Sequence, residues 1–159
     1  MDASALDRWF SQYLEDFAAV ARGERQVDVL LERYAVPLLI TVDDSVVQML
    51  SAQDVTRVVG AQLDKLRSES FATSVKVSGE TTVLNAASAI RREVLSRRRL
   101  DSSEVDRVEM TYLITDAGPG PRIAVMAVHD PPTEGPERAE RRESSDQVMD
   151  SVSSASHRE

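Results

Sequence analysis

The stretch that decides the fold is PLLITVDDSVVQMLSAQDV, residues Pro37–Val55. It holds two apolar runs, Val36–Val42 (counted from the residue before the proline) and Val46–Leu50, separated by the acidic segment Asp43–Ser45. Two short apolar runs around a cluster of turn-forming residues are typical of a β-hairpin. An Asp-Asp pair at such a tip is ordinary turn chemistry, so we interpret it as a turn rather than as a catalytic pair.

Three helices are predicted around this hairpin. The first has Ser4 as its cap and Gly23 as its stop, and a short second helix occupies residues 27–34. The third begins at Ser51-Ala52-Gln53-Asp54, which resembles a capping box, and ends near Ser68. Apolar residues recur at helical spacing in the first helix and predict one buried stripe. This stripe consists of Leu6, Trp9, Phe10, Tyr13, Leu14, Phe17 and Val20.

The chain after residue 70 is strand-like. Apolar and polar residues alternate with a period of two, which is typical of a half-buried strand. The expected strands are residues 71–78, 83–99, 107–114 and 123–128, and the last two are separated by the turn Asp116–Pro121. Three helices and a hairpin followed by long strands predict an α+β fold, in which the helices pack on a curved antiparallel sheet that forms a cone-shaped α+β barrel.

Composition restricts the classes of function. The 159 residues carry a net charge of −8, which argues against broad binding of nucleic acid or an anionic membrane surface. The absence of cysteine excludes disulfides and thiol catalysis, and no apolar run is long enough to span a bilayer. His, Asp and Glu form no cluster with ligand spacing, so we predict no metal site and no cofactor. We expect a cytoplasmic protein.

One domain boundary is predicted near Asp130. Residues 1–130 have the composition of a single folded domain, whereas residues 131–159 are rich in Pro, Ser and charge. Such a segment buries too little apolar surface to offset the entropy of ordering it. The sequence therefore predicts a disordered acidic C-terminal tail, which is either a solvated extension or an interaction segment.

The order of these segments resembles the nuclear transport factor 2-like, or cystatin-like cone, superfamily. It is most similar to the SnoaL-like branch and to actinobacterial domains of unknown function within that branch. The resemblance covers residues 6–130 and rests on segment order and residue type. The matching segments are Tyr34–Ile40, the Asp43-Asp44 turn, Val47–Leu50, Ser51–Leu66, Ser74–Val77, Leu84–Ser88, Tyr112–Ile114 and Ile123–Asp130.

The resemblance implies a cone that holds a small apolar ligand, and dimerisation through the sheet. We therefore expect a small-ligand-binding, homodimeric SnoaL-like domain with no assigned catalysis. The alternative is an isomerase, cyclase or dehydratase that acts on an apolar carbonyl compound, with Tyr13, Tyr34 and Asp43 in the pocket. A weaker alternative is an adaptor whose tail recruits a partner. We assign no catalytic residue, and we expect the pocket to be lined by Trp9, Tyr13, Phe17, Tyr34, Met110 and Tyr112.

Several further residues invite a functional interpretation. The arginine groups at 91–92 and 97–99 alternate across a strand, so we expect them to pair with acidic residues on neighbouring strands. Glu109 is expected on the outer face of the sheet, opposite Tyr112, and His129 at a strand end is expected to be a surface or hydrogen-bonding residue. Leu95 and Leu113 are predicted to lie on the outer face, where they would suit a sheet-to-sheet dimer.

Overall fold

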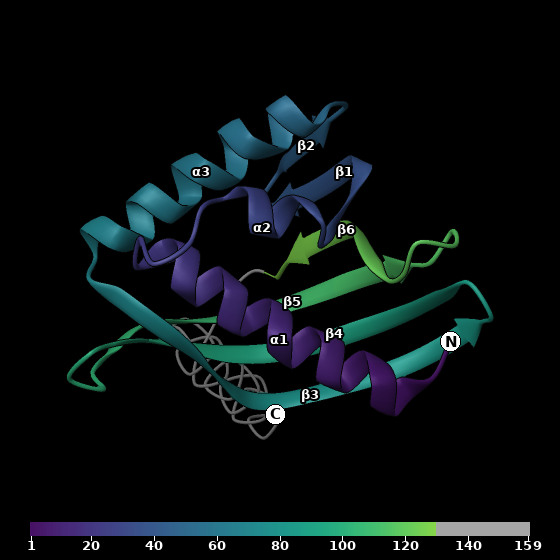
Figure 1. Ribbon diagram of the computed structural model, residues 1–159. Coiled ribbons are helices and arrows are strands. Elements are labelled where there is room, and N and C mark those ends of the chain that lie inside the picture. The colour runs from purple at the N-terminus through teal and green to yellow at the C-terminus, as the bar shows by residue number, and fades with distance from the viewer. Residues whose placement is uncertain (130–159) are drawn as a thin grey trace, which may run out of the picture.

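The computed structural model describes residues 1–129, and the tail predicted for residues 131–159 lies outside the described residues. Helices and strands occur in the predicted order (Figure 1). The elements are α1 (Ala3–Ala21), α2 (Asp28–Leu31), β1 (Tyr34–Val42), β2 (Ser45–Met49), α3 (Ala52–Ser68), β3 (Phe71–Asn85), β4 (Ser88–Arg99), β5 (Glu104–Thr115) and β6 (Arg122–Val128). The predicted α+β fold is confirmed.

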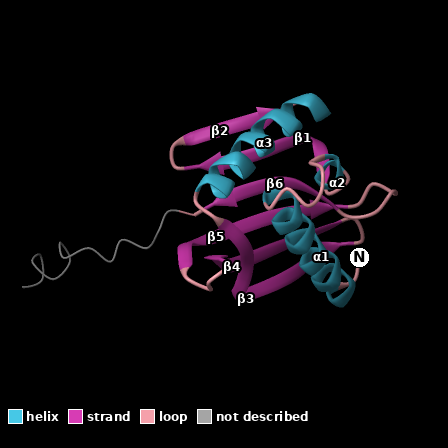
Figure 2. Cartoon of the chain, turned by 60° about the vertical axis from the view of Figure 1, so that its left-hand side comes forward, coloured by secondary structure: helices cyan, strands magenta, loops and turns pink. Residues whose placement is uncertain are grey.

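The six strands form one curved sheet with the order β2-β1-β6-β5-β4-β3. The sheet does not close on itself, so the cone is open between β2 and β3 rather than a complete barrel (Figure 2). Neighbouring strands run antiparallel with one exception, because β1 lies parallel to β6. The expectation of an entirely antiparallel sheet is wrong at this pair. Alternation along a strand shows which face is buried, but not which distant strand lies alongside.

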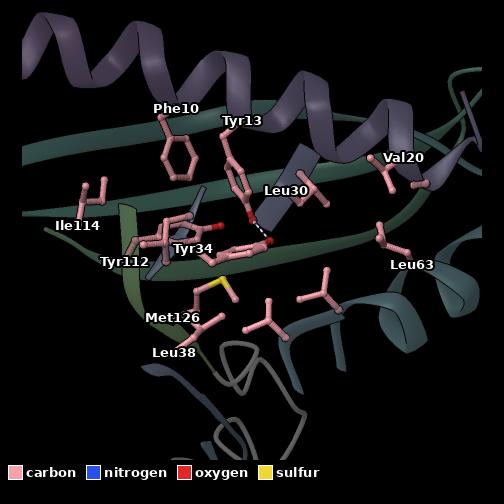
Figure 3. Packing of buried hydrophobic residues seen from close by; sticks show 14 of the residues in the cluster. Phe10, Tyr13, Val20, Leu30, Tyr34, Leu38, Leu63, Tyr112, Ile114 and Met126 are labelled. Atoms are coloured by element: carbon pink, nitrogen blue, oxygen red, sulfur yellow. Dashed lines mark hydrogen bonds between the residues drawn. The ribbon is translucent and has the colours of Figure 1, made fainter. Parts of the chain in front are cut away.

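Helix α1 lies across the concave face of the sheet, and α3 covers the side of β1 and β2 (Figure 1). The two helices and the sheet enclose one apolar core (Figure 3). Aromatic rings form its centre: Phe10 meets Tyr112 edge to face with 4.7 Å between ring centroids, and Phe17 meets Phe71 in the same manner. Burial of the apolar stripe of α1 fixes the position of this helix on the sheet. Helix α1 in turn forms one wall of the cavity described below.

Two element ends differ from the sequence-based expectation. The cap of α1 is Asp2, whose Oδ1 accepts a 2.7 Å hydrogen bond from the Ala5 amide, and Ser4 lies inside the helix. Both residue types cap helices well, so composition alone does not choose between them. Tyr34 was expected on the second helix, but it is the first residue of β1. A buried aromatic residue fits both periodicities when the segment is short.

The segment expected as one strand over residues 83–99 is divided by a turn. Strand β3 continues to Asn85, and β4 begins at Ser88 after a two-residue connection. The Asn85 side chain accepts a 2.8 Å hydrogen bond from the Ala87 amide and closes this turn. The small residues of NAASA are thus a hairpin connection, and β3 is longer than the alternation predicted.

Pro37 lies within β1 at the point where pairing with β6 is irregular. The register between β1 and β6 shifts between Tyr34 and Leu39, as expected for a residue that lacks an amide donor.

Within residues 1–129, no helix is long and apolar enough to cross a membrane.

Candidate ligand cavity

A cavity of about 60 Å³ lies between α1 and the inner face of the sheet. Its volume is sufficient for a few water molecules or a small organic group. Most of its walls are aliphatic, aromatic or thioether side chains, which suit an apolar occupant. The lining residues are Tyr13, Leu14, Phe17, Tyr34, Ile40, Gln62, Ser74, Leu95, Arg97, Val108, Met110, Tyr112, Met126 and Val128.

Most of the side chains expected in a pocket are found at this cavity. Those that line it are Tyr13, Phe17, Tyr34, Met110 and Tyr112. Trp9 is not part of the lining. It stacks on Tyr13 with 6.3 Å between ring centroids, and the Arg33 guanidinium lies 5.5 Å from the centroid of its indole ring. Trp9 therefore packs between the aromatic cluster and a cation rather than against the cavity.

Two of the tyrosines in the cavity lining are joined through their hydroxyl groups. The Tyr13 and Tyr34 oxygens lie 2.9 Å apart and share one hydrogen bond (Figure 3). Burial raises the pKa of Tyr13 to about 12, and it raises the pKa of Tyr34 well above the ordinary value. Burial raises the pKa of Tyr112 as well, and this hydroxyl donates to the Met110 sulfur at 3.1 Å. At neutral pH these groups are neutral hydrogen-bonding groups.

The arginine groups have three different environments. Arg97 pairs with Asp106 across β4 and β5, with 2.7 Å between Nε and Oδ1, and Arg92 pairs with Glu109 on the outer face. These pairs confirm the predicted cross-strand partners of Arg92 and Arg97. Arg98 donates instead to Ser96 Oγ at 3.1 Å, and Arg99 donates to the Glu69 carbonyl oxygen at 3.0 Å. Arg91 departs from the expectation, because it is buried on the inner face.

Arg91 connects α1 to the sheet. Its guanidinium lies 4.6 Å from the centroid of the Phe10 ring and donates to Asp7 of α1, to Thr81 at 2.7 Å and to Glu93. Composition shows a run of arginines but not which of them faces a helix. The alternation that puts Arg92 in solvent also puts Arg91 under α1.

Glu93 is a buried carboxyl group outside the cavity lining. Burial raises its pKa, and the ion pair with Arg91 opposes that effect. Among the described residues its Oε2 has no hydrogen-bond partner. A Cβ added at Gly79, which lies opposite on β3, would be 3.1 Å from Glu93 Oε1, so glycine makes room for the carboxylate.

A second buried acid, Asp16, was not singled out from the sequence. Arg33 donates to Asp16 Oδ2 from Nη2 at 2.6 Å, and Arg25 donates to Oδ1. Asp16 lies at helical spacing from the apolar stripe of α1, and a stripe-facing acid beside two downstream arginines is the signal that could have revealed it. The cluster attaches α1 to the segment before β1.

The remaining candidates lie away from the cavity. Asp43 and Asp44 are exposed and form the hairpin turn, with Asp43 at a positive φ of 50°, so the predicted turn is confirmed. The enzyme alternative placed Asp43 in the pocket, and that placement is wrong. His129 shares a 2.8 Å hydrogen bond with Thr111 and fits the expected surface role.

Leu95 corrects the expected outer face. It pairs with Val108 of β5 and lines the cavity, so it is buried on the inner face. The outer-face assignment of Leu113 is confirmed, because Leu113 alternates with the buried Tyr112 and Ile114.

Within residues 1–129, no group of His, Asp and Glu has the arrangement of a metal site.

Comparison with known proteins agrees with this architecture. The sequence model of the family described as "NTF2-like protein (DUF6841)" matches residues 3–131. The chain belongs to this NTF2-like family. The superfamily resemblance seen in the segment order is thereby confirmed. No curated protein matches the chain.

Solved structures share the fold of this NTF2-like chain at low sequence identity. A Nostoc punctiforme protein of unknown function with a cystatin-like fold has a TM-score of 0.62 and 13% identity, covering 84% of this chain and 97% of its own. A proposed calcium/calmodulin-dependent protein kinase II association domain from Xanthomonas campestris has a TM-score of 0.57 and 12% identity, covering 81% and 87%. A proposed ketosteroid isomerase from Shewanella frigidimarina has a TM-score of 0.53 and 14% identity, covering 74% and 92%. At these identities the likeness concerns the fold alone.

Proposed function

We propose that this chain is a small-ligand-binding domain that dimerises through the outer face of its sheet. The observation that carries the proposal is the apolar cavity under α1, with the Tyr13–Tyr34 hydroxyl pair in its lining. An apolar wall with a few hydrogen-bonding groups is the usual composition of a small-molecule site, because burial supplies affinity and the polar groups fix orientation. Within the superfamily, we assign the chain to the SnoaL-like branch and to actinobacterial domains, on segment order. The cytoplasmic location stays a prediction.

Dimerisation is supported by an apolar row on the outer face. Ile90 of β4 pairs with Leu113 of β5, Leu113 pairs with Val125 of β6, and Val125 pairs with Leu39 of β1. Paired residues point to the same face, so these four side chains form a continuous row across four adjacent strands. A second copy of the sheet would remove this row from water.

The enzyme alternative lacks a base in the cavity. Proton abstraction next to a carbonyl group needs a carboxylate or comparable base within hydrogen-bond reach of the substrate. Asp43 lies at the hairpin tip, and neither Glu93 nor any other carboxylate is in the described lining. The two hydroxyls could orient a carbonyl oxygen, but the described residues favour binding over proton transfer.

Binding can be tested with benzyl alcohol as a neutral probe, by two-dimensional amide NMR. We expect saturable shifts at lining residues such as Leu95 and Met110. The variant Val108→Phe fills the cavity and should abolish them, whereas Val46→Phe, at an exposed position on β2, should not. The absence of saturable shifts in the unmodified protein, or their persistence in folded Val108→Phe protein, would contradict the proposal.

A further inference from the structure

Among residues 1–129, the cavity lining contains one charged side chain. Arg97 of β4 reaches it from the inner face, and its side chain is 17% exposed. Its neighbours in the lining are Leu95 beside it on β4, Val108 on β5 and Ser74, its register partner on β3. A cation at the edge of an apolar cavity creates a site with two chemically different ends.

The donors of this arginine are largely unused. A guanidinium carries five N–H donors in a planar fork. Asp106 Oδ1 lies 2.7 Å from Arg97 Nε, yet this short contact is poorly aligned and Nε has no well-formed hydrogen bond. No hydrogen bond from Arg97 Nη1 or Nη2 is found among residues 1–129, whereas Arg91 on the same strand face donates to three side chains.

We propose that the cavity binds a small amphipathic monoanion, an apolar body with one carboxylate that pairs with the free edge of the Arg97 guanidinium. This inference rests on the proposed ligand-binding function and adds the chemical class of the ligand. A planar carboxylate matches the guanidinium fork and can accept two parallel hydrogen bonds. The apolar body lies against Leu95, Val108 and Met110.

The charges around the site restrict its ligand further. Asp106 offsets part of the charge of Arg97, so one negative charge is better matched than the two of a phosphate ester. The net charge of −8 opposes an anion at long range, so the attraction comes from Arg97 at contact distance. A volume of about 60 Å³ is smaller than the roughly 150 Å³ that encloses a whole benzene ring, so it takes a short chain or the edge of a single ring.

Matched aromatic probes separate charge from shape. At neutral pH, benzoate, benzamide and benzylammonium have nearly the same size and differ in charge. We expect benzoate to bind about tenfold more tightly than benzamide, because a charge-assisted pair is roughly twice as strong as a neutral hydrogen bond. Benzylammonium should bind most weakly. Dissociation constants come from amide NMR titrations of the full chain.

Three variants test whether the preference for benzoate depends on Arg97. Arg97→Gln should remove the preference for benzoate over benzamide. Asp106→Asn removes the competing carboxylate and should tighten benzoate binding. Arg92→Gln changes an arginine on the outer face of the same strand and should leave the preference intact. Amide spectra show whether each variant is folded, and Asp106→Asn tests the proposal even if Arg97→Gln does not fold.

The outcomes distinguish the two proposals. Binding of benzyl alcohol and benzamide with no advantage for benzoate would overturn the monoanion proposal and leave ligand binding intact. An advantage for benzoate that survives in Arg97→Gln, or that is lost in Arg92→Gln, would also overturn it. If benzyl alcohol, benzamide and benzoate all fail to bind, both the ligand-binding proposal and the monoanion proposal are overturned.

Discussion

The hydroxyl groups of Tyr13 and Tyr34 share a hydrogen bond of 2.9 Å and thereby join α1 to the first strand of the sheet. Both residues are fully enclosed by the core, so neither hydroxyl can exchange its partner for bulk water. The bond is also part of the cavity wall. Stability of the fold and shape of the cavity therefore depend on the same two side chains.

Replacing one tyrosine of this pair with phenylalanine should destabilise the protein more than the loss of a single exposed hydroxyl group would. In Tyr34→Phe, the Tyr13 hydroxyl is left buried without a partner, at a cost of about 1–3 kcal/mol in the free energy of unfolding. The double variant Tyr13→Phe/Tyr34→Phe removes both polar groups and should lose less than the sum of the single variants. Urea unfolding followed by the fluorescence of Trp9, the one tryptophan, measures each value. Additive losses would contradict the coupling.

Alkaline pH should unfold the protein before its tyrosines ionise. The chain has three tyrosines, and burial raises the pKa of each in the folded state, to about 12 for Tyr13. Below pH 10 the hydroxyls are neutral in both states, and the stability from burying them is fully present. As pH rises from 10 towards 12, the unfolded chain loses protons that the folded chain retains, so the free energy of unfolding falls.

The slope is up to about 1.4 kcal/mol per pH unit for each tyrosine. Tyrosinate absorbance and circular dichroism, recorded on the same samples, should change together. Tyrosinate formation near pH 10 in protein that is still folded would show that the hydroxyls are accessible, contrary to the structure.

Asp16→Asn should loosen the attachment of α1. The carboxylate accepts hydrogen bonds from Arg33 and Arg25, and both are charge-assisted. The amide keeps the shape but loses the charge, so we expect a loss of about 1–3 kcal/mol in the free energy of unfolding, moderated because the arginines remain partly hydrated. Glu15→Gln changes the exposed acid next in sequence and should alter stability by less than about 0.5 kcal/mol. Equal effects of both variants would argue against a special role for Asp16.

Two glycine-to-alanine variants should act in opposite directions. At Gly79 an added methyl group would lie 3.1 Å from Glu93 Oε1, which the buried Arg91 prevents from moving away. Overpacking of this kind costs about 1–3 kcal/mol. At Gly60, inside α3, nothing lies within 4 Å of the added methyl group, so alanine should raise stability by up to about 1 kcal/mol. Chemical denaturation of both variants tests the contrast, and a stabilised Gly79→Ala protein would contradict it.

Leu113→Lys should weaken the proposed dimer. It places a charge in the centre of the apolar row formed with Ile90, Val125 and Leu39. Sedimentation equilibrium should show a dimer for the unmodified protein and a monomer for the variant. Leu100→Lys, at an exposed position in the turn between β4 and β5, is the matched control and should stay dimeric. Unmodified protein that is monomeric would contradict the dimer itself.

Local sequence determined the elements and their buried faces. The Val36–Leu50 segment specifies a hairpin through its turn residues, and the spacing from Leu6 to Val20 specifies one apolar helix face. Alternation in β5 correctly placed Tyr112 and Glu109 on opposite faces of the sheet. These features depend on neighbours within a few residues, which the sequence shows directly.

Only the tertiary structure decided which distant side chains meet. The parallel pairing of β1 with β6, the inward position of Leu95 and the contact of Arg91 with Asp7 depend on strand order, register and the placement of α1. A shift of register by one residue exchanges the two faces of a strand, so a small ambiguity along the chain becomes a complete change of partners. Tyr13 and Phe17 could be found from helical spacing and Tyr112 from strand alternation. Arg97, the one charged residue in the described cavity lining, could not.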